Sequence, residues 1–138
     1  MTEKKVIELL RSYRAYAYEI EALDLSLRQL RSSAVMPGKG LDGMPHGGGP
    51  QDLSGYAAKI DKAERRLEEK KREAHKARDR VENAIEKLKD PDERTALRYH
   101  YILGVPWYKA AAKMHVSDAT VYRLRKQAVA KLTHVLRG

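Results

Sequence analysis

Side chains that can read a nucleic acid lie close together between positions 117 and 126. Arg123 and Lys126 carry positive charge, and an arginine can bind guanine through two hydrogen bonds. Hydroxyl groups can donate or accept at base edges and phosphates, and the methyl group of threonine or alanine can contact thymine. The sequence therefore predicts a DNA-binding face, whose candidate residues are Ser117, Asp118, Ala119, Thr120, Tyr122, Arg123 and Lys126.

A second group of basic residues flanks this face in the sequence and could contact DNA phosphates. Arg94 and Arg98 lie one helical turn apart. Ion pairs with Asp90 or Glu93 account for these two arginines about as well as phosphate contacts do. The candidate phosphate contacts are Arg94, Arg98, Lys109, Lys113, Arg125 and Lys131.

Two short predicted helices, joined by a tight turn at residues 115–117, must position the candidate face. Ser117 suits the N-cap of the second helix, and Asp118 adds negative charge at its positive end. His115 takes a turn position that often has a left-handed backbone and prefers glycine. Apolar and small residues at the spacing of a helix-turn-helix form the predicted seam between the two helices, namely Ala110, Ala111, Met114, Val116, Val121 and Leu124.

One further helix is predicted just before this pair. Asp90 can cap it, Pro91 suits its first position, and Glu93 can reach back to complete a capping box. Gly104 supplies a left-handed exit, and Trp107 is expected in the core of the small bundle. The predicted buried face consists of Ala96, Leu97, Tyr101 and Ile102.

The N-terminal part has the apolar pattern of long paired helices. Apolar residues recur in steps of three and four from Val6 to Ala34, and a second, weaker heptad pattern runs from an N-cap at Asp52 to Leu88. A Gly- and Pro-rich linker separates them at 34–50. Alanines of the second pattern leave room for tyrosines and leucines of the first, so we expect an antiparallel hairpin, formed within one chain or between two.

These patterns predict an all-α fold. A long, coiled-coil-like antiparallel helical hairpin occupies 1–89, and a three-helix helix-turn-helix domain occupies 90–138. Long amphipathic helices also predict a homo-oligomer, with a dimer favoured, through the N-terminal helices.

Charge and composition narrow the classes of partner. The chain has 28 Lys and Arg against 19 Asp and Glu, a net charge of +9. The last 49 residues hold 9 basic and 4 acidic side chains, so positive charge is densest around the helix-turn-helix, as expected for a protein that binds a polyanion. The absence of cysteine and of any visible leader or membrane anchor predicts a cytoplasmic protein with no membrane partner.

From Leu88 to Leu132 the chain resembles region 4 of sigma-70-type factors. The resemblance lies in Tyr101-Ile102-Leu103-Gly104, Trp107, Ala111, Val116-Ser117, Thr120-Val121 and Lys131-Leu132. The whole chain is similar to the small sigma-like, ArpU-type regulators of phages and prophages. The resemblance implies promoter recognition in a bacterial host cell, with the second motif helix in the major groove and RNA polymerase as a further partner. The N-terminal half lacks a promoter-melting region, which favours a regulator over a replacement sigma factor.

Three classes of function compete. A DNA-binding transcriptional regulator agrees with most signals. One alternative is a DNA-packaging protein, such as a small terminase subunit. The other is a helical scaffold or interaction protein whose charged face only contacts water. An enzyme is not expected, because the five histidines lack metal-ligand spacing and no motif indicates a catalytic group or a cofactor.

Overall fold

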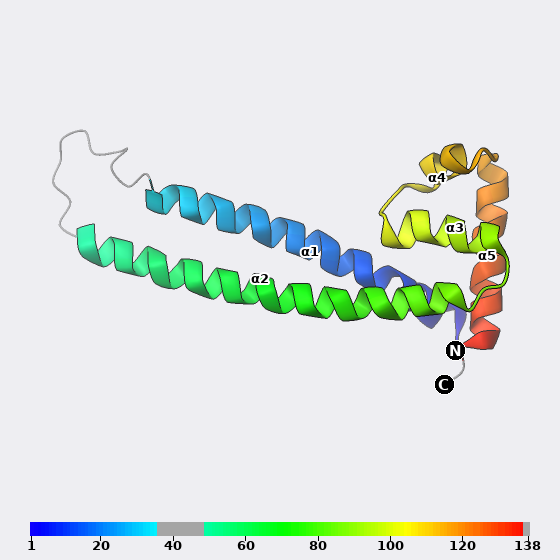
Figure 1. Ribbon diagram of the computed structural model, residues 1–138, viewed down its shortest axis with the longest axis horizontal. Coiled ribbons are helices and arrows are strands. Elements are labelled where there is room, and N and C mark those ends of the chain that lie inside the picture. Colours follow the sequence, from blue (N-terminus) through cyan, green and yellow to red (C-terminus); the bar gives the residue numbers. More distant parts are fainter. Residues whose placement is uncertain (36–48, 137–138) are drawn as a thin grey trace. The chain divides into compact units, whose positions relative to one another are not determined.

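The computed structural model describes residues 1–35 and 49–136, except for the side chains of residues 35 and 49–54. These residues form five α-helices and one π-helix, with no strand among them (Figure 1). The predicted all-α fold class is therefore confirmed. In chain order the helices are α1 (Glu3–Val35), α2 (Gly49–Glu86), α3 (Pro91–Leu97), the π-helix η2 (Arg98–Ile102), α4 (Trp107–Met114) and α5 (Asp118–Val135).

Helix α2 differs from the predicted second helix at both ends. It begins at Gly49 instead of at an N-cap at Asp52, and Pro50 fits its first turn because the N–H groups there need no partner within the helix. It ends at Glu86 instead of Leu88, where the next two N–H groups bond to carbonyls three residues back. The two-residue difference at the C-terminal end is of the size expected where helix ends tighten or fray, whereas the start lies three residues before Asp52.

The two long helices pair in antiparallel directions within one chain. Arg31 forms an ion pair with Glu64 at 3.2 Å, and Glu19 forms one with Lys70 at 3.6 Å. The residue number therefore falls along α1 as it rises along α2, which confirms the predicted hairpin and places its pairing within the chain (Figure 1). The predicted linker at 34–50 lies largely outside the described residues.

The chain divides into two compact units. The first contains residues 1–16 and 73–138, and the second contains residues 17–72. The first unit thus joins the predicted helix-turn-helix region to the start of α1 and the end of α2. Independent folding of 90–138 as a domain stays a prediction.

The main core of the first unit draws side chains from four segments. Val6 and Leu10 of α1 are fully buried, although Leu10 lies off the predicted apolar seam of that helix, which passes through Val6, Leu9 and Tyr13. The reason is that Leu10 belongs to a cluster containing α5 residues as well as α2 residues. The other members of this cluster are Val81, Ile85, Leu88, Leu97, Tyr101, Ile102, Ala128, Val129 and Leu132.

The start of α3 confirms one part of the predicted cap and contradicts another. The Asp90 side chain accepts a hydrogen bond from the Asp92 N–H at 2.9 Å, with Pro91 at the first turn. Glu93 does not complete a capping box; it is fully buried, and both of its carboxylate oxygens accept from the Lys131 ammonium, at 3.0 and 2.8 Å. Burial of a carboxylate requires such a partner, and α5 supplies it.

The exit from this helix passes through a wider helical turn that was not predicted. Residues 98–102 form a π-helix, closed by a hydrogen bond from the Leu103 N–H to the Arg98 carbonyl. Gly104 then takes the predicted left-handed backbone, with φ of 70°. A Cβ atom at Gly104 would lie 2.6 Å from Cζ of Arg14, at the far end of a flexible side chain that can shift, so the left-handed backbone is the main reason that this position favours glycine.

Candidate nucleic-acid interface

A second, smaller core holds α4 against α5 and confirms the predicted helix-turn-helix seam. Of the six predicted residues, Ala110, Ala111, Val121 and Leu124 are buried, while Met114 and Val116 are partly buried against them. Ala96 of α3 joins the same cluster. The two alanines of α4 allow close approach because a methyl group occupies little space between packed helices.

The turn between α4 and α5 has a left-handed residue at the predicted position. His115 has φ of 59° and ψ of 41°. The Val116 N–H donates to the Ala111 carbonyl at 3.0 Å, and the His115 N–H donates to the Ala112 carbonyl at 3.2 Å. These two hydrogen bonds are a Schellman motif, which ends α4 and turns the chain toward α5.

Ser117 caps α5 as predicted. Its hydroxyl oxygen accepts from the Thr120 N–H at 3.1 Å and lies 2.9 Å from the Thr120 hydroxyl. Two of the candidate base contacts are therefore hydrogen-bonded to each other at the start of the helix. Asp118 follows in the first turn, where its charge complements the helix dipole.

The rest of the candidate DNA-binding face is open to solvent. Ala119, Arg123 and Lys126 are exposed, and Tyr122 is 49% exposed. Their spacing of three and four residues places them along one side of α5. Of the seven predicted residues, Thr120 alone is half-buried.

The predicted phosphate contacts separate into exposed and engaged side chains. Lys109 and Lys113 of α4 are exposed. Arg125 is half-buried, with its guanidinium carbon 5.4 Å from the centre of the Trp107 ring. Lys131 is bound to the buried Glu93 carboxylate. Arg125 and Lys131 therefore stabilise the first unit, whereas the two α4 lysines are available to a ligand.

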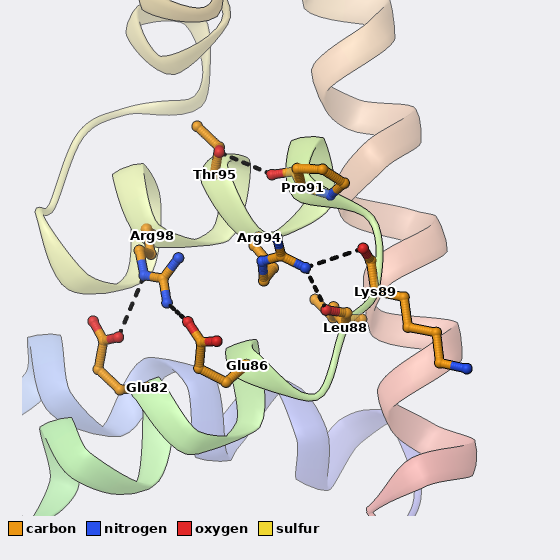
Figure 2. Close-up of polar contacts among 8 residues, drawn as sticks. All are labelled: Glu82, Glu86, Leu88, Lys89, Pro91, Arg94, Thr95 and Arg98. Carbon is orange, nitrogen blue, oxygen red and sulfur yellow. Dashed lines mark hydrogen bonds and ion pairs between the residues drawn. The ribbon is translucent and has the colours of Figure 1, made fainter.

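Arg94 binds the segment that follows α2, and Arg98 binds the last turns of α2 (Figure 2). The Arg94 guanidinium donates to the Leu88 carbonyl at 2.8 Å and to the Lys89 carbonyl at 3.0 Å.

Arg98 does not pair with the carboxylates predicted for it, those of Asp90 or Glu93. It pairs with Glu82 at 3.3 Å and with Glu86 (Figure 2). Both partners lie in α2.

Beneath the face lies an aromatic cluster around Trp107. The His100 ring stacks on Trp107 with centroids 3.9 Å apart, and its Nδ1–H donates to the Val105 carbonyl at 2.9 Å. Burial lowers the pKa of His100, and the nearby arginines lower it further, against the effect of the Val105 hydrogen bond. Burial also raises the pKa of Tyr101. These groups are packing residues.

One neighbour of the face was not predicted from the sequence. A hollow of about 320 Å³ is lined by Glu3 and Ile7 of α1 together with α5 residues, among them Tyr122 and Lys126. The first turns of α1 therefore border the candidate DNA-binding face. No local pattern indicates this neighbour, because α1 and α5 lie at opposite ends of the sequence.

The comparisons with known proteins give one family. Residues 44–133 match the model of a family described as "Protein of unknown function (DUF1492)". The chain belongs to this family. The family match covers all of α2 and the helices through most of α5, and it leaves α1 outside. No curated protein and no solved structure matches the chain.

The described residues hold neither a metal-binding cluster nor a membrane-spanning helix. No group of three or more His, Cys, Asp or Glu side chains there could hold a metal ion. Within the same residues, every helix is too short or too polar to cross a membrane.

Proposed function

We propose that this member of the DUF1492 family is a transcriptional regulator that binds double-stranded DNA sequence-specifically through α5. The observation that carries the proposal is the exposed row of Ala119, Tyr122, Arg123 and Lys126 on a helix held by a helix-turn-helix seam. In such motifs the second helix enters the major groove and its N-terminal residues contact base edges.

The chemistry of the row suits this role. Arg123 can donate two hydrogen bonds to guanine, and Asp118 can accept from the amino group of cytosine. The Ala119 methyl group can contact thymine, and Lys126 can donate to a base or a phosphate. Lys109 and Lys113 are the proposed phosphate contacts from α4 because both are exposed.

The wider role comes from the resemblance to sigma region 4. It supports promoter recognition and contact with RNA polymerase. It also supports a phage or prophage origin and a place in the bacterial cytoplasm. The proposed activity is binding, without catalysis or a cofactor.

The test is selection of bound sequences from random duplexes by the full chain over a salt series. We expect an enriched motif, which Arg123→Ala/Lys126→Ala loses together with at least roughly tenfold affinity, because a good base contact contributes about 1–3 kcal/mol. The matched control is Lys62→Ala/Arg65→Ala, which removes two exposed positive charges from α2 and should keep the motif.

Two results would contradict the proposal. Steeply salt-dependent binding without an enriched motif would indicate non-specific contacts with phosphates, as in a DNA-packaging protein. Absence of binding at low salt, with or without polymerase, would leave a helical scaffold or interaction protein.

A further inference from the structure

We infer that the start of α1 is part of the DNA interface, with Lys4 and Arg11 as contacts to phosphates beside the groove that α5 enters. This inference deepens the proposed function and rests on it for the choice of ligand. Both residues lie in α1, which is outside the helix-turn-helix and outside the family match. Neither is among the contacts predicted from the sequence.

The first turns of α1 border the exposed row of α5. Glu3 and Ile7 line a hollow of about 320 Å³ together with Tyr122 and Lys126, two members of that row. Val6, next to Ile7, is fully buried in the core that α1 shares with α5. This part of α1 belongs to the same compact unit as α5, so the two helices are held together beside the candidate face.

Lys4 and Arg11 extend this border along α1. A second hollow, of about 450 Å³, shares Glu3 and Ile7 with the first, and Lys4 and Arg11 also line it. Both basic side chains are exposed. Seven residues place them on the same side of the helix and about 10.5 Å apart along it. They can therefore reach different phosphates of one strand, which follow each other every 3.4 Å or so along the DNA axis.

Arg11 also lies near the start of α4. Burial is the main cause that lowers the pKa of His100 at this junction, and the charge of Arg11 is among those that lower it further. Burial raises the pKa of Tyr101, and charges that include that of Arg11 oppose this effect. The start of α1 therefore borders α5 and also approaches the helix that carries Lys109 and Lys113, the proposed phosphate contacts.

The charge of α1 changes sign along the helix. Residues 1–16, which belong to the first unit, have four basic and two acidic side chains, a net charge of +2. Residues 17–34 have two basic and three acidic side chains, a net charge of −1. The positive excess thus lies where α1 borders the candidate DNA-binding face, as expected for contact with phosphates. Because Glu3 and Glu8 line the same surface, the contact is assigned to individual basic side chains.

The test is binding of labelled duplexes to the full chain, measured by fluorescence anisotropy over a salt series. Lys4→Ala/Arg11→Ala should weaken binding to the selected motif and to a random duplex by the same factor, because phosphate contacts carry no sequence information. Loss of two phosphate contacts should reduce the slope of log affinity against log salt by about two. The decrease in affinity from about 50 to 200 mM salt should then be roughly tenfold smaller than in the parent chain.

Two further variants separate a contact from a general effect of charge. Lys5→Ala/Arg66→Ala removes the same kinds of charge, at an exposed position on the opposite side of α1 from the first hollow and at an exposed position of α2 in the second unit. It should keep the parent slope. Lys4→Arg/Arg11→Lys keeps both charges and should also keep it. Circular dichroism checks that all variants have the helical content of the parent chain.

Three results would overturn the inference. They are an unchanged slope in Lys4→Ala/Arg11→Ala, an equal decrease in the control, and tighter binding by the variant, which would mean that α1 hinders DNA. An enriched motif with an unchanged slope would leave the proposed function intact without a contribution from α1. A reduced slope without an enriched motif would support the α1 contact and contradict sequence-specific binding.

Discussion

The backbone of His115 is in a conformation that histidine adopts at a cost. It is the non-glycine residue with positive φ among those described, and its side chain is exposed. A left-handed residue with a Cβ atom costs about 1–2 kcal/mol, and glycine removes this cost but adds entropy to the unfolded chain. We expect His115→Gly to raise the free energy of unfolding by about 0.5 kcal/mol, measured by urea denaturation.

The companion variant is His115→Val, whose branched Cβ atom suits the left-handed region poorly. It should lower the free energy of unfolding by about 1–2 kcal/mol. If both variants had the same stability as the parent chain, the turn would not hold His115 in the left-handed conformation in solution.

The junction between η2 and α4 depends on a neutral histidine. His100 stacks on Trp107 and is surrounded by positive charge from Arg11, Arg14 and Arg125. Because its pKa in the folded protein lies below the unfolded value of 6.5, the unfolded chain binds this proton more readily. The stability of the junction is therefore fully present above about pH 6.5 and is lost as the pH falls below it.

We expect the free energy of unfolding to decrease between pH 7.5 and 5.5, and His100→Gln to remove most of that decrease. Urea denaturation can be followed by the fluorescence of Trp107, the single tryptophan of the chain. His75→Gln, at an exposed position of α2, should keep the parent pH dependence. A decrease of the same size in His100→Gln would assign it to other groups.

The helices from α3 to α5 could be predicted from the sequence because their signals are local. The cap at Asp90, the glycine at 104 and the serine at 117 each act within a few residues of their own position. Contacts distant in sequence could not be predicted in this way. Glu93 reaches Lys131, 38 residues away, and the sequence offered a closer capping role for it.

The candidate DNA-binding face was predictable for the same reason, since its exposed row and buried seam alternate within one helix. Its surroundings were not. A π-helix follows α3, Arg98 pairs with α2, and the start of α1 borders α5. Neither a π-helix nor the docking of a distant helix leaves a periodic pattern that sequence reasoning can detect.

The first unit unites residues from both ends of the sequence, which makes Leu10 a test of how it folds. This side chain is fully buried in the cluster that includes α5 residues. Leu10→Ala should lower the free energy of unfolding by about 2–5 kcal/mol, because it leaves a cavity in that core. Trp107 fluorescence should report the loss, although Trp107 lies far from Leu10 in the sequence.

Leu103→Ala, a change at a 58% exposed leucine, is the control and should alter stability by less than about 0.5 kcal/mol. The predicted division at 89 and 90 gives a different expectation for Leu10→Ala. If residues 90–138 fold independently, the Trp107 transition would stay where it is in the parent chain.

The order of folding follows from the interleaved composition of the first unit. Val6 and Ala128 share one core although roughly 120 residues separate them, and contacts of such long separation form slowly because a long loop must close first. Pairing of α1 with α2 closes that loop in small steps. Each further helical turn that pairs shortens the stretch of unpaired chain between residues 16 and 73. We therefore expect formation of the hairpin to precede completion of the core that Val6 and Ala128 share, whereas the α4–α5 seam, built from residues 96–124, can form without it.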